Sequence, residues 1–162
     1  MPGKTINVGI GELQVSRESD TVIVTRGLGS CVAVCFYDRI AKIAGMAHIM
    51  LPTDNGRSDH LSARFADTGV PRLLEKMIQQ GANPERLVVK MAGGARMFQM
   101  PGGNSLLEIG ERNAEAVKTA LKNLKLNLAA ADTGKDYGRT VEFSVATGEL
   151  LVRAIGRSVT II

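Results

Sequence analysis

The chain contains few of the residues that cross-link a small fold or bind metal: two cysteines and two histidines among 162 residues. Two cysteines do not make a disulfide framework. A bridge between Cys31 and Cys35 would join neighbours on one face of one strand, where the backbone holds them too far apart. We therefore expect free thiols in a reducing, cytoplasmic environment. Neither a C-x-x-C nor an H-x-x-x-H spacing is present, so a structural zinc site is poorly supported and no metal is expected.

Aromatic residues make up only 4% of the chain, and no apolar run approaches the roughly 18 residues of a membrane-spanning helix. The first residues lack the basic start and apolar stretch of an export signal. Nucleic-acid-binding proteins usually combine a basic cluster with stacking aromatics, whereas the net charge of +4 comes from scattered lysines and arginines. We expect no nucleic acid and no membrane insertion; the positive charge fits an acidic protein substrate.

The composition is that of a globular protein, and the absence of repeats and linkers predicts one domain over residues 1–162. Short β-branched and apolar segments predict strands, and two apolar stripes predict helices. The expected strands cover 6–15, 21–25, 32–37, 43–47, 87–91, 126–131, 140–146 and 150–155. The expected helices run from about residue 67 to 80 and from a cap near Asn113 to about residue 124.

This order lacks the regular βαβ alternation of nucleotide-binding folds. It predicts an α+β fold, a mixed β-sheet or β-sandwich core with about two to three helices packed mainly on one side. Both faces of the strands at 32–37 and 43–47 are apolar, so we expect these strands to be central and covered on both sides.

Cys31 is the strongest candidate for a nucleophile, because it starts a strand directly after the turn Gly27–Ser30. If Arg39 and Ile40 form a two-residue hairpin loop, Cys31 lies directly opposite His48 on one face, with Cβ atoms roughly 4.5–5.5 Å apart. An imidazole there can take the thiol proton and generate a nucleophilic thiolate. A loop one residue longer or shorter would put the two side chains on opposite faces. Cysteine is also a common core residue, which is our interpretation of Cys35.

Two further features could assist this pair. The turn at Gly29 and Ser30 can expose backbone N–H groups beside the thiol as an oxyanion hole. Thr25 is a third candidate side chain. If 21–25 and the strand after Cys31 form a hairpin, Thr25 lies beside Cys31 and about 10 Å, two strand spacings, from His48. A direct bond between Thr25 and His48 requires a different strand arrangement, and the residues alone do not decide between the two.

At these residues the sequence resembles the CheD family of chemotaxis proteins, the receptor glutamine deamidases. The resemblance extends over most of the chain and depends on the joint order of several short motifs. They are VIVT at 22–25, GLGSC at 27–31, AHIMLP at 47–52, ADT at 66–68, AGGA at 92–95, MF at 97–98, IGERN at 109–113 and ELLVR at 149–153. One departure is the stretch Gln99 to Leu107, which looks longer than the connection usual in the family.

The resemblance implies hydrolysis of glutamine side-chain amides to glutamate in the cytoplasmic helices of chemoreceptors, with release of ammonia. It implies a Cys-His-Thr site at Cys31, His48 and Thr25, without a cofactor. It also implies a fold like the catalytic domain of cytotoxic necrotizing factor toxins and, as a partner, the phosphatase CheC. The alternatives are a non-catalytic adaptor that binds CheC or receptors, and a transglutaminase-like acyl transfer to amines.

Overall fold

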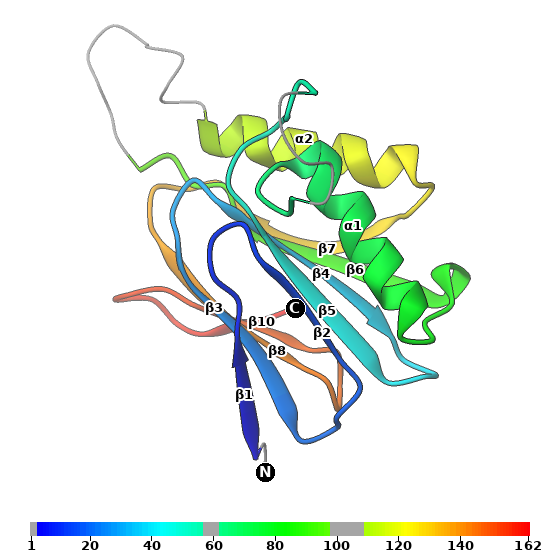
Figure 1. The fold of residues 1–162 in the computed structure, drawn as a ribbon. Coiled ribbons are helices and arrows are strands. Elements are labelled where there is room, and N and C mark those ends of the chain that lie inside the picture. The colour runs from blue at the N-terminus through cyan, green and yellow to red at the C-terminus, as the bar shows by residue number, and fades with distance from the viewer. Residues whose placement is uncertain (1–2, 57–61, 98–108) are drawn as a thin grey trace, which may run out of the picture.

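Two β-sheets pack face to face, and two α-helices of the described chain cover the outer face of one of them (Figure 1). The computed structural model describes residues 3–56, 62–97 and 109–162. The longer connection expected at Gln99–Leu107 lies outside these residues. The predicted α+β class, with helices on one side, is confirmed. No helix within the described ranges is long and apolar enough to cross a membrane.

Each sheet has five strands, and both sheets are mixed. The first sheet has the order β1 (Lys4–Asn7), β3 (Thr21–Leu28), β8 (Arg139–Ser144), β9 (Leu150–Arg153) and β10 (Thr160–Ile161). The second has the order β2 (Leu13–Ser16), β5 (Ile43–Ile49), β4 (Val32–Asp38), β6 (Leu87–Gly93) and β7 (Leu128–Thr133). The pairs β1–β3 and β6–β7 are parallel, and the other neighbours are antiparallel. Apart from the N-terminal strands and the unpredicted β10, the strand ends lie within three residues of expectation.

The central strands β4 and β5 are buried along their whole length, as their apolar faces predict. Side chains alternate between two cores because successive residues of a strand point to opposite faces. Cys35 and Tyr37 pack into the core between the two sheets, whereas Val34 and Phe36 pack under the helices. The side chains of this hairpin that face the first sheet, His48 among them, therefore lie in a water-poor interior.

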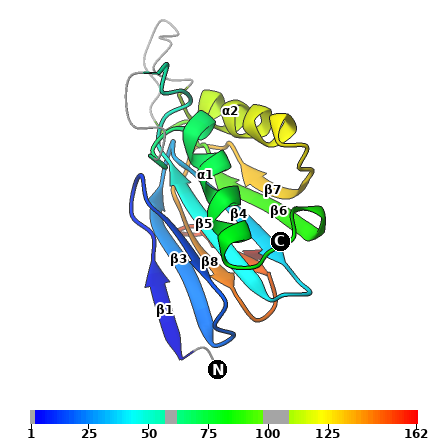
Figure 2. The ribbon, with the colours of Figure 1, turned by 45° about the vertical axis from the view of Figure 1, so that its right-hand side comes forward.

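The helices lie side by side over the second sheet, and the first sheet lies on the other side of it (Figure 2). Helix α1 (Ala66–Gln79) packs on β5 and β2, and ends before Gly81, whose φ of +107° suits glycine. A short 3₁₀ helix, η1 (Pro84–Arg86), leads into β6. Helix α2 (Ile109–Asn123) packs on α1, β4 and β7. Asn113 therefore lies inside α2, and its predicted role as the N-cap is wrong.

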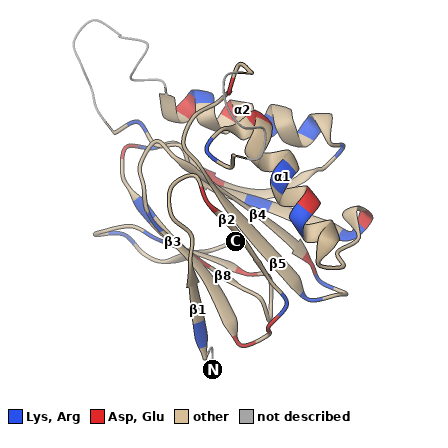
Figure 3. Ribbon diagram, in the orientation of Figure 1, with Lys and Arg blue, Asp and Glu red and all other residues tan. Residues whose placement is uncertain are grey.

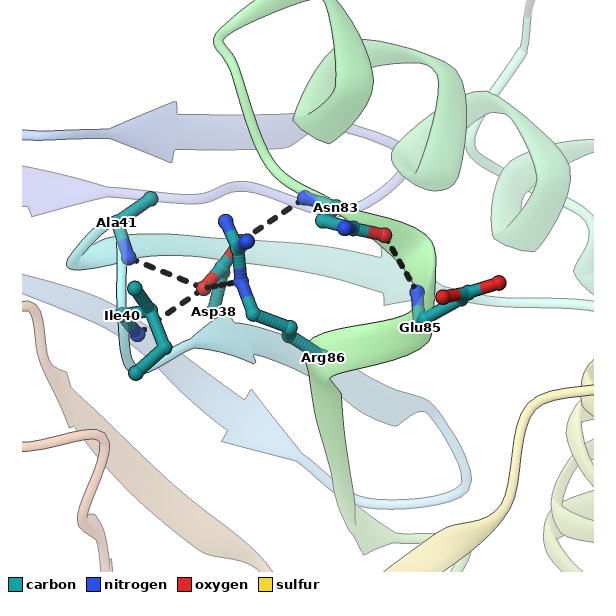
Figure 4. A network of polar contacts seen from close by, with 6 residues as sticks. All are labelled: Asp38, Ile40, Ala41, Asn83, Glu85 and Arg86. Atoms are coloured by element: carbon teal, nitrogen blue, oxygen red, sulfur yellow. Dashed lines mark hydrogen bonds and ion pairs between the residues drawn. The ribbon is translucent and has the colours of Figure 1, made fainter.

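The hairpin between β4 and β5 has a four-residue loop, so the predicted two-residue loop is wrong. Asp38 pairs with Ile43, and Ala33 pairs with His48. The side chain of Asp38 sets the longer loop: its Oδ1 accepts hydrogen bonds from the N–H groups of Ile40 and Ala41, each at 3.0 Å (Figure 4). The register moves by two residues, and a shift of two keeps every side chain on its face.

In the N-terminal half of the chain, successive strands belong to different sheets, whereas the sequence predicts one continuous strand and a hairpin within one sheet. The segment expected as one strand, 6–15, is divided between β1 in the first sheet and β2 in the second, with Gly11 at a φ of +77° in the connection. Strand β3 belongs to the first sheet and β4 to the second. The predicted hairpin between 21–25 and the strand after Cys31 is therefore wrong, and Thr25 approaches His48 from the opposite sheet.

Asp38→Ala is expected to lower the free energy of unfolding by about 3 kcal/mol, because a buried carboxylate with several donors is removed. Asp38 also accepts from the N–H of Asn83 at 2.9 Å and from Arg86 at 2.8 Å (Figure 4). The Arg86 guanidinium holds the pKa of Asp38 well below its usual range. The stabilisation is thus present above the unfolded-state pKa of about 4 and is lost as the pH falls through the folded-state value.

Urea unfolding at pH 7 and at successively lower pH measures this effect. Asp136→Asn, on an exposed loop residue, is the matched control and should change stability by less than about 0.5 kcal/mol. A difference between Asp38→Ala and the parent that stays constant down to pH 2 would contradict the assigned role of the carboxylate.

Candidate active site

Cys31 lies on the turn between β3 and β4, one residue before β4 begins. Its thiol is free, and the residue is 9% exposed. Burial raises the pKa of this thiol above its ordinary value, so the resting protein holds it protonated at neutral pH. Cys35 is also free but fully buried between the sheets, and burial raises the pKa of its thiol as well. The interpretation of Cys35 as a core residue is confirmed.

The turn that carries Cys31 lies against a glycine-rich segment at the end of β6. The N–H of Gly94 donates to the carbonyl of Cys31 at 2.8 Å, and the N–H of Ala95 donates to the carbonyl of Gly29 at 2.9 Å. Gly93 has a φ of +113°, and a Cβ there would lie 2.2 Å from the Cys31 carbonyl oxygen. Only glycine permits this approach, so the last residue of β6 helps to determine how the Cys31 turn is held.

His48 lies near the end of β5 with its backbone paired to the β1–β2 connection. Its N–H donates to the carbonyl of Glu12, and its carbonyl accepts from the N–H of Gly11, both at 3.0 Å. The residue is 1% exposed, and burial lowers the pKa of the imidazole. The ring is therefore neutral at pH 7, as a general base must be.

Cys31 and His48 lie on the same face of the second sheet, toward the first sheet, but they are not directly opposed. Ala33 is the residue opposite His48, and Cys31 lies two residues before Ala33. Diagonal neighbours of this kind are about 7–8 Å apart, still within reach of long side chains. The prediction of direct opposition is wrong because of the longer loop, whereas the shared face follows from the even shift.

Thr25 contacts His48 directly, although the two residues come from different sheets. The Thr25 Oγ1 lies 2.7 Å from the His48 Nδ1 and 2.6 Å from the carbonyl oxygen of Val8. Both side chains are almost completely buried. Strand β3 presents Thr25 toward the core between the sheets, and β5 presents His48 from the other side. The alternative that the sequence left open, a direct Thr25–His48 bond, is the observed one.

These two contacts assign the tautomer of His48. A hydroxyl has one hydrogen to donate, and the Val8 carbonyl can only accept, so the Thr25 hydroxyl donates to Val8. Its oxygen must then accept the hydrogen bond from His48, which places the ring proton on Nδ1. The Nε2 is left with a free lone pair. It is buried and has no hydrogen-bond partner among the described residues, so it is available as a base on the face that carries Cys31.

Gly29 and Ser30, the residues expected to offer backbone N–H groups beside the thiol, differ in their hydrogen bonds. Within the described ranges no acceptor is found for the backbone N–H of Ser30 or of Cys31. The N–H of Gly29, in contrast, donates to the carbonyl of Gly27 at 3.0 Å. Ser30 and Cys31 thus keep backbone donors next to the thiol, while Gly29 contributes to the shape of the turn.

Asn113 on α2 also contacts this region, a role that was not predicted for it from the sequence. Its Nδ2 donates to the carbonyls of Ser30 at 3.0 Å and Met50 at 2.9 Å. A signal was present: Asn113 is a polar residue on the same helix face as the buried residues Val117, Ala120 and Leu121. In the part of the chain that the structure describes, no three His, Cys, Asp or Glu side chains meet in a way that could hold a metal ion.

Comparison with known proteins agrees with these motifs. The family model described as CheD chemotactic sensory transduction matches residues 50–154. A probable chemoreceptor glutamine deamidase CheD of Caldanaerobacter subterraneus subsp. tengcongensis is 48% identical over 160 residues, 98% of each chain. The chemoreceptor glutamine deamidase CheD of Thermotoga maritima is 50% identical over 149 residues, 92% of this chain and 91% of that one.

Among solved structures, the hypothetical protein YfiH of Bacillus licheniformis superposes with a TM-score of 0.43 at 13% identity, over 75% of this chain and 49% of that chain. This likeness is too low to indicate a shared function. The sequence relatives, in contrast, are similar over nearly their whole length. This chain belongs to the CheD family.

Proposed function

We propose that this protein hydrolyses glutamine side-chain amides to glutamate in the cytoplasmic helices of chemoreceptors, through a thioester on Cys31. The observation that carries the proposal is the chain of contacts from Val8 through Thr25 to His48. It fixes a neutral imidazole with a basic Nε2 on the same face as a free thiol. The names of the relatives, chemoreceptor glutamine deamidases, supply the substrate class.

In the first half of the reaction the Nε2 of His48 accepts the proton of the Cys31 thiol as the sulfur attacks the carboxamide carbon. The carbonyl oxygen of the substrate becomes an oxyanion, which accepts hydrogen bonds from the N–H groups of Ser30 and Cys31. When the C–N bond breaks, the imidazolium returns its proton to the leaving nitrogen, and ammonia departs. The enzyme is left as a thioester.

In the second half, water attacks the thioester carbon while the Nε2 of His48 accepts one of its protons. The C–S bond breaks, the sulfur regains a proton from the imidazolium, and the product leaves as a carboxylic acid, which ionises by giving its proton to the released ammonia. Thr25 keeps the Nδ1 proton in place throughout, because its own hydrogen is donated to Val8. The Thr25 hydroxyl thus orients His48 and does not contact the reacting atoms.

The test is incubation of the wild-type protein with a purified cytoplasmic fragment of a chemoreceptor. Released ammonia should match, mole for mole, the glutamines that mass spectrometry finds converted to glutamate. Ammonia without such conversion, or conversion that proceeds equally fast without the protein, would contradict the proposal.

The charge distribution supports an acidic protein surface as the partner. The chain has a net charge of +4, and Figure 3 shows Lys and Arg spread over helices, strands and loops. Such a surface can attract an acidic protein, and added salt weakens this attraction. Because the positive charges are scattered, they do not form the basic cluster that is typical of nucleic-acid-binding proteins. A CheC phosphatase as a second partner stays a prediction, tested by binding of purified CheC to the protein.

Alkylation of Cys31 by iodoacetamide is expected to be slow at pH 7 and to accelerate as the pH rises toward and beyond 9.0. The reason is that burial raises the pKa of this thiol above its ordinary 9.0 and lowers that of the His48 imidazole, and both effects disfavour a thiolate–imidazolium pair in the resting protein. The measurement is the alkylation rate against pH, with the modified cysteine identified by peptide mapping.

The background variant for this experiment is Cys35→Ala, which removes the other thiol from the assay. A rate that already reaches its plateau below pH 7 would show a preformed thiolate and contradict the predicted order of events. A rising profile shows that the thiol is protonated in the resting protein, as the predicted order of events requires.

A further inference from the structure

Asn113 is a polar residue buried inside a helix, where stability alone does not favour it. It is fully buried, and its Oδ1 has no hydrogen-bond partner among the described residues. Asparagine is a poor residue for a helix interior, and an unsatisfied buried acceptor adds a further cost. The other end of the side chain, the Nδ2, makes both of its hydrogen bonds to backbone carbonyls.

The orientation of this amide follows from its neighbours. The groups that face it are the carbonyl oxygens of Ser30 and Met50, which can only accept hydrogen bonds. The NH₂ end must therefore face them. Ser30 directly precedes Cys31, and Met50 lies two residues after His48. One side chain thus connects the backbone beside the nucleophile with the backbone beside the base.

Three successive backbone carbonyls of the Cys31 turn accept hydrogen bonds from α2 and from the segment that follows β6. Those of Gly29 and Cys31 accept from the backbone N–H groups of Ala95 and Gly94, whereas that of Ser30 accepts from the Asn113 side chain. In a planar trans peptide the carbonyl and the N–H that follows it point in opposite directions. Holding the Ser30 carbonyl toward α2 therefore directs the N–H of Cys31 away from α2.

We propose that Asn113 is a positioning residue that sets the oxyanion hole, by holding the peptide between Ser30 and Cys31 with its N–H directed at the substrate oxygen. The inference rests on the proposed function. Of the three carbonyl contacts, this one is made by a side chain, so a substitution can remove it without changing the other two. Asn113 does not touch the reacting atoms; it acts through the backbone of Cys31.

The test compares Asn113→Leu and Asn113→Ala with Val117→Ala. Leucine keeps the branched shape in a somewhat larger side chain and removes the amide, whereas alanine removes the amide without adding bulk. Val117 is a buried residue one turn further along the same face of α2. Misplacing an oxyanion donor should lower kcat about 10- to 100-fold, since removing one costs about 10² to 10³. KM should stay within about 3-fold of wild type, because the hole acts on the transition state. Val117→Ala should keep the wild-type kcat, even if it lowers the melting temperature as much as the Asn113 substitutions do.

Two further measurements separate positioning from general damage. Alkylation of Cys31 by iodoacetamide needs no oxyanion hole, so its rate should change by less than about 3-fold in both Asn113 variants. Acyl transfer from p-nitrophenyl acetate, whose intermediate is also an oxyanion, should fall with kcat. The inference is overturned if kcat stays near wild type, if alkylation falls in parallel, or if Val117→Ala loses as much activity.

The same two substrates distinguish failure of this inference from failure of the proposed function. If the wild type transfers acetyl groups in a Cys31-dependent way but leaves receptor glutamines unchanged, the proposed function fails and Asn113 is still tested by the ester. If receptor glutamines are deamidated and the Asn113 variants keep the wild-type kcat, the inference alone fails. If neither substrate is turned over in a Cys31-dependent way, both fail.

Discussion

Cys31→Ala is expected to reduce ammonia release from a receptor fragment by at least about 10⁴-fold, because the covalent route is lost with the sulfur. The residue lies on the inter-sheet face that also carries the free Nε2 of His48. Two neighbouring side chains do not replace it: the Thr25 hydroxyl donates its hydrogen to Val8, and Cys35 is fully buried in the core between the sheets. The measurement is the initial rate of ammonia release together with the glutamine-to-glutamate mass shift.

Cys35→Ala is the matched control, since it removes a thiol from the same sheet face two positions beyond Ala33. It is expected to keep the rate within about 3-fold while losing some stability through a small cavity. A Cys31→Ala variant that deamidates as fast as the parent would remove the basis of the mechanism. If wild type and variant bind the receptor equally and neither changes its glutamines, the protein acts as an adaptor. If added primary amines become joined to the glutamines, the reaction is acyl transfer rather than hydrolysis.

Thr25→Val is expected to lower kcat by roughly 10²- to 10³-fold, less than the roughly 10⁴-fold loss caused by removing a charged orienting carboxylate from a catalytic histidine. Valine has nearly the shape of threonine but cannot accept the Nδ1 hydrogen bond of His48. The imidazole then loses the contact that keeps its proton on Nδ1, and part of the population carries the proton on Nε2, where it cannot act as a base. Steady-state kinetics of ammonia release measure the effect.

The same strand offers a matched control in Thr21→Val. Thr21 is as buried as Thr25 and lies on the same face of β3, but its hydroxyl has no partner in the described structure. Its replacement should leave kcat unchanged. Thr25→Ser keeps the hydroxyl and should recover most of the activity. Equal losses in Thr25→Val and Thr21→Val, or no recovery with serine, would show that Thr25 supports packing and not the tautomer.

The prediction that Cys31 and His48 share a face is confirmed because the side-chain period of a strand is two and the loop is longer than predicted by two residues. The sequence is not sufficient to predict their register. The loop length depends on the side chain of Asp38 accepting from Ile40 and Ala41, and on its contacts with Asn83 and Arg86 some 45 residues later. A contact so distant in the chain leaves no trace in the hairpin sequence itself.

The position of Thr25 could not be predicted for a related reason. A hairpin and a crossing between two sheets both need a short glycine-containing turn, and the segment after Thr25 fits either. What decides is the pairing of β3 with β8, which begins more than a hundred residues later. Asn113 could have been found: a polar residue on an otherwise apolar helix face indicates a buried partner.

The contact between Thr25 and His48 joins two separate layers, because Thr25 comes from the first sheet and His48 from the second. Their 2.7 Å separation is therefore maintained by the side chains that fill the space between the layers, including Tyr37 at the far end of β4 and Leu150 on β9. Volume changes at such residues alter the interlayer distance, and a displacement of a few tenths of an ångström lengthens a hydrogen bond that sets a protonation state. Remote core substitutions should thus impair turnover at temperatures where the protein is still fully folded.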